Sequence, residues 1–181
     1  MGACIALRMA LSDQSRISAL ILMSSTANAE TPESLATVTQ MRDVWVSTPS
    51  PSEDIMNIAI RSWGGDLDVD GPRAQQVKRD WIKRHSGAEQ VDSTLQSMIE
   101  RDNLVERLHE ITVPVLLVHG EQDATWELAH AEIIQKGLVN SKVDMKVIKD
   151  SGHLLVWMRD SDDVSQMIAD FVKGQMVVEN K

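Results

Sequence analysis

The chain has 181 residues, 43% of them hydrophobic and 25% charged, a composition typical of a soluble globular protein with a sizeable core. Its net charge of −9 at pH 7 argues against binding to nucleic acid or to an anionic membrane surface. No apolar run reaches the about 18 residues that a membrane span needs, and the amino-terminal residues do not resemble a signal peptide. The single cysteine excludes an internal disulfide and is typical of a reducing compartment, so we expect a cytoplasmic protein.

The pattern of apolar residues predicts alternating helices and strands at both ends of the chain. Strands are predicted over 17–25, 111–120 and 141–148. The first two are continuous apolar runs, typical of strands buried on both faces of a parallel sheet. Helices are predicted over 2–12, about 125–136 and about 162–172. Strand–helix–strand–helix order indicates an α/β fold with parallel pairing.

The middle of the chain interrupts this order. It contains several helical patterns and no convincing strand, with helices predicted over 33–47, 52–63, 72–85 and 88–104. A helical stretch inserted between two strands of one sheet is typical of a cap. We therefore expect core residues 1–26, a helical cap over 27–105, core residues 106–175 and a tail over 176–181.

Two candidate catalytic residues follow predicted strands. Asp123 comes after VPVLLVHG, and His153 comes after the next strand, in the stretch DSGH. Because parallel neighbours bring their carboxyl ends to one edge of the sheet, we expect the two side chains to share that edge, where ligands bind in open α/β sheets. A carboxylate there could orient the imidazole and stabilise its protonated form. Glu121 and Glu127 are alternative partners for His153.

At these residues the sequence resembles the α/β-hydrolase family. The resemblance is carried by VPVLLVHGEQDATW, by DSGHLLVW and by MGACIALRMAL, which is similar to the family's nucleophile helix. In that family the nucleophile lies in a G-x-S-x-G turn, and the triad follows in the order Ser, Asp, His. Met1 and Gly2 match the last two positions of this turn, which makes them a remnant of the oxyanion hole and elbow. The resemblance thus implies a serine one residue upstream of Met1.

The resemblance implies a fold and an activity. It implies the carboxyl-terminal part of a cap-bearing α/β hydrolase that uses no cofactor and cleaves a carboxylic ester or lactone of a small apolar molecule. Asp123 would orient His153, the general base. Dehalogenases and epoxide hydrolases of the family use an aspartate nucleophile, so whether the missing nucleophile is Ser, Asp or Cys stays open. The chain alone would be inactive, and the alternative is a non-catalytic homologue that binds a ligand or a partner.

Three tryptophans could line a pocket or could simply pack in the fold, and one further histidine could be catalytic or structural. Trp126, Trp63 and Trp45 are candidate pocket residues, with packing inside the cap as the alternative for the last two. His119, at the end of a strand, is interpreted as structural. The sequence has no HExxH or paired-histidine spacing, so no metal site is expected.

Three further residues bear on the nucleophile and the partners. Ser24 and Ser25 lack the glycine-flanked turn that presents a nucleophile, and Cys4 is expected to be packed within its helix. The strand over 17–25 would leave an unpaired edge in this chain, a feature that favours association. A homodimer through that edge is therefore a further expectation.

Overall fold

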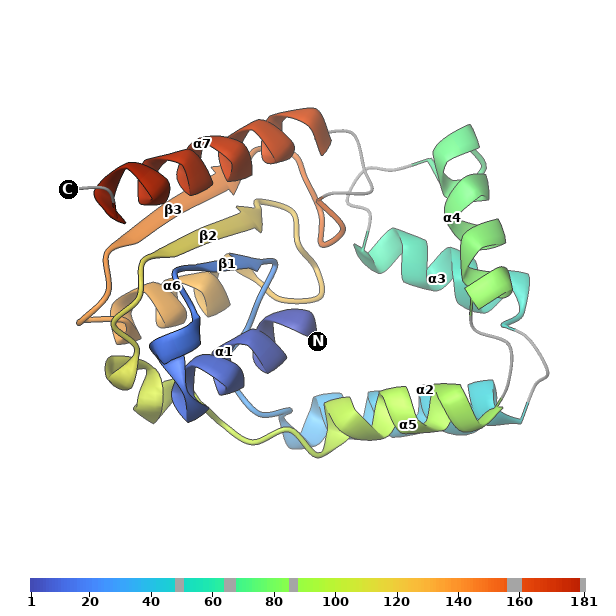
Figure 1. Ribbon diagram of the computed structural model, residues 1–181. Coiled ribbons are helices and arrows are strands. Elements are labelled where there is room, and N and C mark those ends of the chain that lie inside the picture. Colours follow the sequence, from blue (N-terminus) through green and yellow to red (C-terminus); the bar gives the residue numbers. More distant parts are fainter. Residues whose placement is uncertain (48–50, 64–67, 85–87, 156–160, 180–181) are drawn as a thin grey trace. The chain divides into compact units, whose positions relative to one another are not determined.

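The computed structural model describes residues 1–47, 51–63, 68–84, 88–155 and 161–179 (Figure 1). The elements are, in chain order, α1 (Gly2–Ser12), η1 (Gln14–Arg16), β1 (Leu20–Met23), α2 (Pro32–Val46), α3 (Glu53–Trp63), α4 (Pro72–Arg84), α5 (Ala88–Ile99), η2 (Val105–Glu110), β2 (Val115–Gly120), α6 (Leu128–Gly137), β3 (Val143–Ile148) and α7 (Ser161–Glu179). Contacts divide the chain into two compact units. One comprises Met1–Asn28, Ser62–Asp66 and Asn103–Lys181, and the other comprises Ala29–Arg61 and Leu67–Asp102.

The first unit contains a three-stranded parallel sheet in the order β1-β2-β3. Leu22 lies opposite Leu117, which in turn lies opposite Met145. β2, in the centre, is buried along its whole length, as its continuous apolar run predicts. The predicted α/β fold with three parallel strands and flanking helices is confirmed.

Helices cover both faces of this sheet (Figure 1). On one face, Leu20, Leu22, Val115 and Leu117 pack with apolar side chains from α1, η2 and α6. On the other face, alternate residues of the same strands pack against α7 through Val164, Met167, Ile168 and Phe171. The alternation of side chains along each strand supplies both layers. The sheet is thereby held rigidly beneath the loops at its carboxyl edge.

The ends of several elements differ from the prediction; the helix predicted over 88–104, for example, is α5 and ends at Ile99. β1 begins four residues after Arg16, because residues 14–16 form a 3-10 turn, and it ends before Ser24, whose φ is +43°. β2 begins after Pro114, which has no N–H to donate, although its carbonyl accepts a hydrogen bond from Leu20 N. α7 runs through Gly174 to Glu179, so the tail predicted for 176–181 is helical as far as it is described. One glycine costs a helix only about 1 kcal/mol, and helix-forming neighbours outweigh it. Residues 180–181 lie outside the described ranges.

The second unit contains the whole of α2, α4 and α5, together with α3 as far as Arg61. The four helices predicted for the middle of the chain are present, and α2 packs along α5. Ile60, Val69, Ala74 and Val77 form a small core between α3 and α4. Arg101 forms an ion pair with Glu30 at 2.6 Å, and both side chains are at least 96% buried. This pair joins the residues after α5 to those before α2.

None of the described helices is both long enough and apolar enough to cross a membrane.

Candidate functional site

The loops that follow β2 and β3 lie against each other beyond the ends of the strands. Glu121 N donates to the Ile148 carbonyl at 2.9 Å, and Gln122 N donates to the Ser151 carbonyl at 2.8 Å. Gly120 permits this approach. A Cβ atom at Gly120 would lie 2.3 Å from the Gly152 oxygen and 2.4 Å from the Ser151 oxygen, far inside van der Waals contact. The absence of a side chain there lets the histidine loop lie directly on the acid strand.

This approach brings Asp123 and His153 together. Asp123 Oδ2 lies 2.9 Å from His153 Nδ1, and the Asp123 side chain is fully buried. Since a carboxylate accepts and an imidazole N–H donates, Nδ1 carries the hydrogen. In the neutral ring Nε2 is then the basic nitrogen. The juxtaposition expected from the parallel strands is present, and it gives His153 the tautomer that a general base requires.

The Asp123 carboxylate is fixed from both sides. Its Oδ1 accepts hydrogen bonds from Thr125 N and Trp126 N, each at 2.9 Å, so residues 123–126 form a closed Asx-type turn. Burial on its own raises the pKa of Asp123. The hydrogen bond and charge of His153, with the Trp126 N–H and nearby His119, outweigh burial and hold that pKa below its usual value. The group is therefore ionised at neutral pH.

His119 lies beneath this turn and is 1% exposed. Its Nε2 is 2.8 Å from the Trp126 carbonyl and 3.5 Å from Asp123 Oδ2. The carbonyl can only accept, so Nε2 carries the hydrogen. His119 contacts the acid from the side opposite to solvent, and the structural role expected for it agrees with this burial.

Glu121 and Glu127, the alternative acid partners, make other contacts than one with His153. Both glutamates are exposed: Glu121 Oε2 accepts a hydrogen bond from Asp150 N at 3.2 Å, and Glu127 precedes the first residue of α6. Asp150 has a φ of +57°, a left-handed conformation at the turn into the histidine loop. The geometry therefore selects Asp123 as the partner of His153.

The predicted elbow remnant is the exposed start of α1. Met1 precedes this helix, and its carbonyl accepts hydrogen bonds from Cys4 N and Ile5 N. A Cβ atom on Gly2 would meet nothing within 4 Å among the described residues. The oxyanion role of Met1 and Gly2 stays a prediction. Cys4 is buried, with its Sγ 3.5 Å from the Thr26 carbonyl, so it is packed as expected.

The three candidate pocket tryptophans have different surroundings. Trp45 is 7% exposed and packs edge-on against Trp81, with ring centroids 4.9 Å apart, within the helical unit. Trp63 ends α3, and its carbonyl accepts a hydrogen bond from Leu154 N at 3.0 Å, which ties it to the residue after His153. Trp126 is half-buried beside the acid. The contacts of Trp126 and Trp63 place both at the histidine and acid loops, and those of Trp45 do not.

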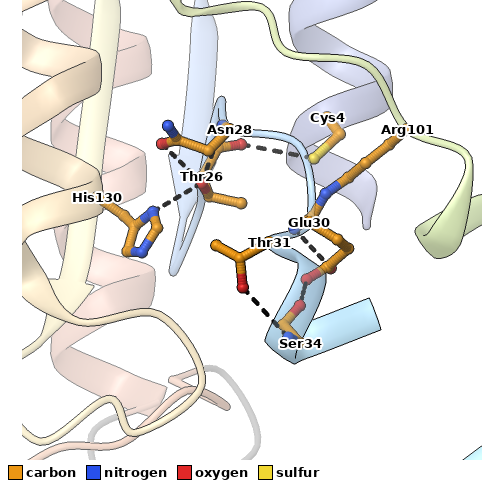
Figure 2. Close-up of polar contacts among 8 residues, drawn as sticks. All are labelled: Cys4, Thr26, Asn28, Glu30, Thr31, Ser34, Arg101 and His130. Atoms are coloured by element: carbon orange, nitrogen blue, oxygen red, sulfur yellow. Dashed lines mark hydrogen bonds and ion pairs between the residues drawn. The ribbon is translucent and has the colours of Figure 1, made fainter. Parts of the chain in front are cut away.

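A polar contact beside the site was not predicted. His130 Nδ1 lies 2.9 Å from Thr26 Oγ1, and Figure 2 shows the ring pointing toward that hydroxyl. The His130 ring also packs edge-on against Trp126, with centroids 5.0 Å apart. The spacing of four residues between Trp126 and His130 is a sequence signal for the ring contact but not for the contact with Thr26. Thr26 follows β1, so this pair links the carboxyl end of β1 to α6.

Among the described residues, no three His, Cys, Asp or Glu side chains gather in an arrangement that could hold a metal ion.

Comparisons with known proteins agree with this geometry. The profile of the Ndr family matches residues 1–179. The chain belongs to the Ndr family. Over 81 residues, 45% of this chain and 23% of the relative, it is 31% identical to monoacylglycerol lipase ABHD6 from Mus musculus.

Solved structures resemble the fold over nearly the whole chain. A thermophilic esterase from Thermogutta terrifontis matches 96% of this chain with a TM-score of 0.82 and 21% identity. The enol-lactonase from Burkholderia xenovorans LB400 matches 96% with a TM-score of 0.76 and 18% identity. The fold is therefore that of the α/β-hydrolase superfamily. The chain spans 62% and 63% of the lengths of these two proteins.

Proposed function

We propose that this chain supplies the acid and the histidine of a hydrolytic triad, Asp123 and His153, whose serine lies one residue upstream of Met1. The observation that carries the proposal is the 2.9 Å contact between a fully buried, ionised carboxylate and an imidazole Nδ1. The His153 side chain is 19% exposed, so its ring is reachable from solvent while its acid partner is not. That combination suits a general base.

In the proposed reaction, His153 Nε2 takes the proton of the serine hydroxyl as the oxygen attacks the carbonyl carbon. The imidazolium is stabilised by Asp123 and gives the proton to the departing alkoxide. Water then attacks the acyl-enzyme, with His153 again as the base, and the acid is released. Loss of a triad serine costs a factor on the order of 10⁶ in rate, so the 181 residues alone are expected to be inactive. The reaction uses no cofactor.

We propose a carboxylic ester or lactone of a small apolar molecule as the substrate. Two similar structures are named as an esterase and an enol-lactonase, which supports carbonyl chemistry of this class. The half-buried indole of Trp126 is three residues from the acid, and it offers apolar surface beside the reacting groups.

The test is labelling of the native protein, purified from its source, with a fluorophosphonate probe. We expect labelling, with a rate that falls by at least about 10³-fold in His153→Ala and in Asp123→Asn, since a triad acid is worth on the order of 10⁴. The matched control is His109→Ala, a change to an exposed histidine of η2, which should label normally. Absence of labelling of the native protein would refute a serine nucleophile.

A second candidate function is a non-catalytic module that binds a second copy of this chain. Among the described residues β1 pairs with β2 alone, and the register turns the N–H and C=O groups of Ile21 and Met23 toward the free edge. On the neighbouring α1, Met1, Ile5 and Met9 form an apolar stripe at intervals of four residues, and each is 49–58% exposed.

Two antiparallel copies could pair this edge with itself, because each would offer the same unpaired backbone groups. This candidate predicts a dimer of the 181-residue chain in analytical ultracentrifugation. It also predicts that Ile21→Pro, which removes an edge donor, gives a monomer. A wild-type chain that remains monomeric at all concentrations tested would exclude it.

A further inference from the structure

Two buried polar atoms at the carboxyl ends of β1 and β2 lack a hydrogen-bond partner among the described residues. They are His119 Nδ1 and Ser24 Oγ, on side chains that are 1% and 8% exposed. Buried polar atoms in folded proteins are almost always paired with protein or with an ordered water. If the two atoms lie close together, a single water could be the hydrogen-bond partner of both.

The strand register places the two residues at neighbouring positions. Met23 lies opposite Val118, and Ser24 N still donates to the Val118 carbonyl at 2.9 Å, so Ser24 occupies the position next to His119. Neighbouring strands are about 4.8 Å apart, a distance that a single water can bridge between two side chains. Ser24 has a φ of +43°, a conformation that costs energy for a residue other than glycine.

The hydrogen-bonding requirements of the two atoms are complementary. His119 Nε2 carries the ring hydrogen because it faces the Trp126 carbonyl at 2.8 Å, so Nδ1 must accept. A hydroxyl or a water can donate to Nδ1. The Ser24 hydroxyl can then donate to that water, or accept from it, without disturbing the Nε2–H group.

We propose that His119 is a positioning residue for Asp123, with its Nε2–H fixed by the Trp126 carbonyl and its Nδ1 satisfied by Ser24 through one bridging water. His119 holds the Trp126 carbonyl, and the N–H of the same residue holds Asp123 Oδ1 at 2.9 Å. The hydrogen bond from His119 thus holds the turn over 123–126 in place, and Asp123 Oδ2 stays within hydrogen-bond distance of His153. The catalytic value of this arrangement rests on the proposed function.

The test uses nuclear magnetic resonance of the 181-residue chain labelled with ¹⁵N. Ring ¹⁵N shifts should show His119 as the Nε2–H tautomer. The hydrogen on His153 Nδ1 should appear far downfield and exchange slowly with solvent. His119→Asn, whose shorter amide cannot reach the Trp126 carbonyl, should make this hydrogen exchange roughly 2- to 10-fold faster, the effect of one lost hydrogen bond. His119→Gln places an N–H near the original Nε2 and should restore the rate to within about twofold.

Ser24→Ala provides an independent measurement. It should shift the ¹⁵N resonance of His119 Nδ1, because the bridging water loses one of its partners, and leave the hydrogen on Nε2 and the ring buried. The Leu117 amide in the centre of β2 serves as the internal standard, because its exchange reports opening of the whole sheet. If the Leu117 amide and the His153 hydrogen accelerate equally in His119→Asn, His119 is a packing residue and the proposal is wrong. An unchanged His153 exchange rate, or a wild-type His119 with its hydrogen on Nδ1, would overturn it equally.

The hydrogen-exchange measurements do not require the protein to be catalytically active, so they can fail or succeed separately from the labelling test. If the native protein resists the fluorophosphonate but the exchange rates follow the order above, the proposed reaction fails and the positioning of Asp123 by His119 stands. If the native protein is labelled and His119→Asn leaves both exchange and labelling rate unchanged, the positioning proposal fails alone.

Discussion

Replacing Gly120 by alanine should separate the two loops that bring Asp123 and His153 together. The new Cβ atom would lie 2.3 and 2.4 Å from two carbonyl oxygens and 2.8 Å from the Ser151 carbonyl carbon. All three are backbone atoms, so no side chain can rotate away, and the loop must move by about 1 Å to reach ordinary contact. Overpacking of this kind costs about 1–3 kcal/mol. At this chain length we expect Tm to fall by about 2–12 °C.

The same movement should lengthen the 2.9 Å contact between Asp123 and His153. Thermal unfolding followed by circular dichroism gives Tm, and the downfield hydrogen on His153 Nδ1 reports the contact. Gly174→Ala is the matched control, because Gly174 is an exposed position of α7 where a Cβ atom meets nothing within 4 Å among the described residues, and alanine there adds about 0.5–1 kcal/mol of stability. A Gly120→Ala chain with unchanged Tm and an unchanged His153 resonance would refute the reasoning about the close approach of the loops.

Three further predictions concern stability. Because the pKa of Asp123 is depressed in the folded chain, its ionised form stabilises the fold above the unfolded pKa of about 3.9, and this contribution is lost as pH falls through the folded value. Urea unfolding should therefore show Asp123→Asn less stable than wild type at pH 7, with the difference shrinking toward pH 3; a constant difference would contradict this. Glu30→Ala should cost about 3–5 kcal/mol because it removes the Glu30 carboxylate that pairs with the buried Arg101 charge, and Glu30→Leu with Arg101→Met should recover much of that loss. Leu117→Ala, at a site 1% exposed in the central strand, should cost about 2–5 kcal/mol in the same assay, and a cost below 1 kcal/mol would argue against its place in the core.

The sequence was sufficient to predict the sheet and the pair at its edge. Continuous apolar runs indicated buried strands, and strand–helix–strand order required parallel neighbours. Asp123 and His153 then had to share an edge. The observed order β1-β2-β3 and the 2.9 Å contact follow from that reasoning. Periodicity and chain order were enough for the shared edge, whereas the choice of Asp123 over Glu121 and Glu127 needed the resemblance to the α/β-hydrolase family.

Features that depend on tertiary contacts could not be predicted in this way. The contact of His130 with Thr26 joins residues 104 positions apart, and nothing in either neighbourhood indicates the other. The shortening of β1 depends on a 3-10 turn and on the left-handed Ser24, whose conformation is set by the adjoining strand. α7 extends beyond the end predicted near residue 172, because no proline or capping residue ends the helix there.

The central claim is that Asp123 and His153 serve a serine that directly precedes Met1 in the native protein. The most direct measurement is the site of fluorophosphonate attachment, determined by digesting the labelled native protein and sequencing the modified peptide by mass spectrometry. We expect an adduct on a serine immediately before the Met-Gly-Ala-Cys sequence. An adduct on Ser24 or Ser25, or a native protein of 20.1 kDa that takes no probe, would contradict it.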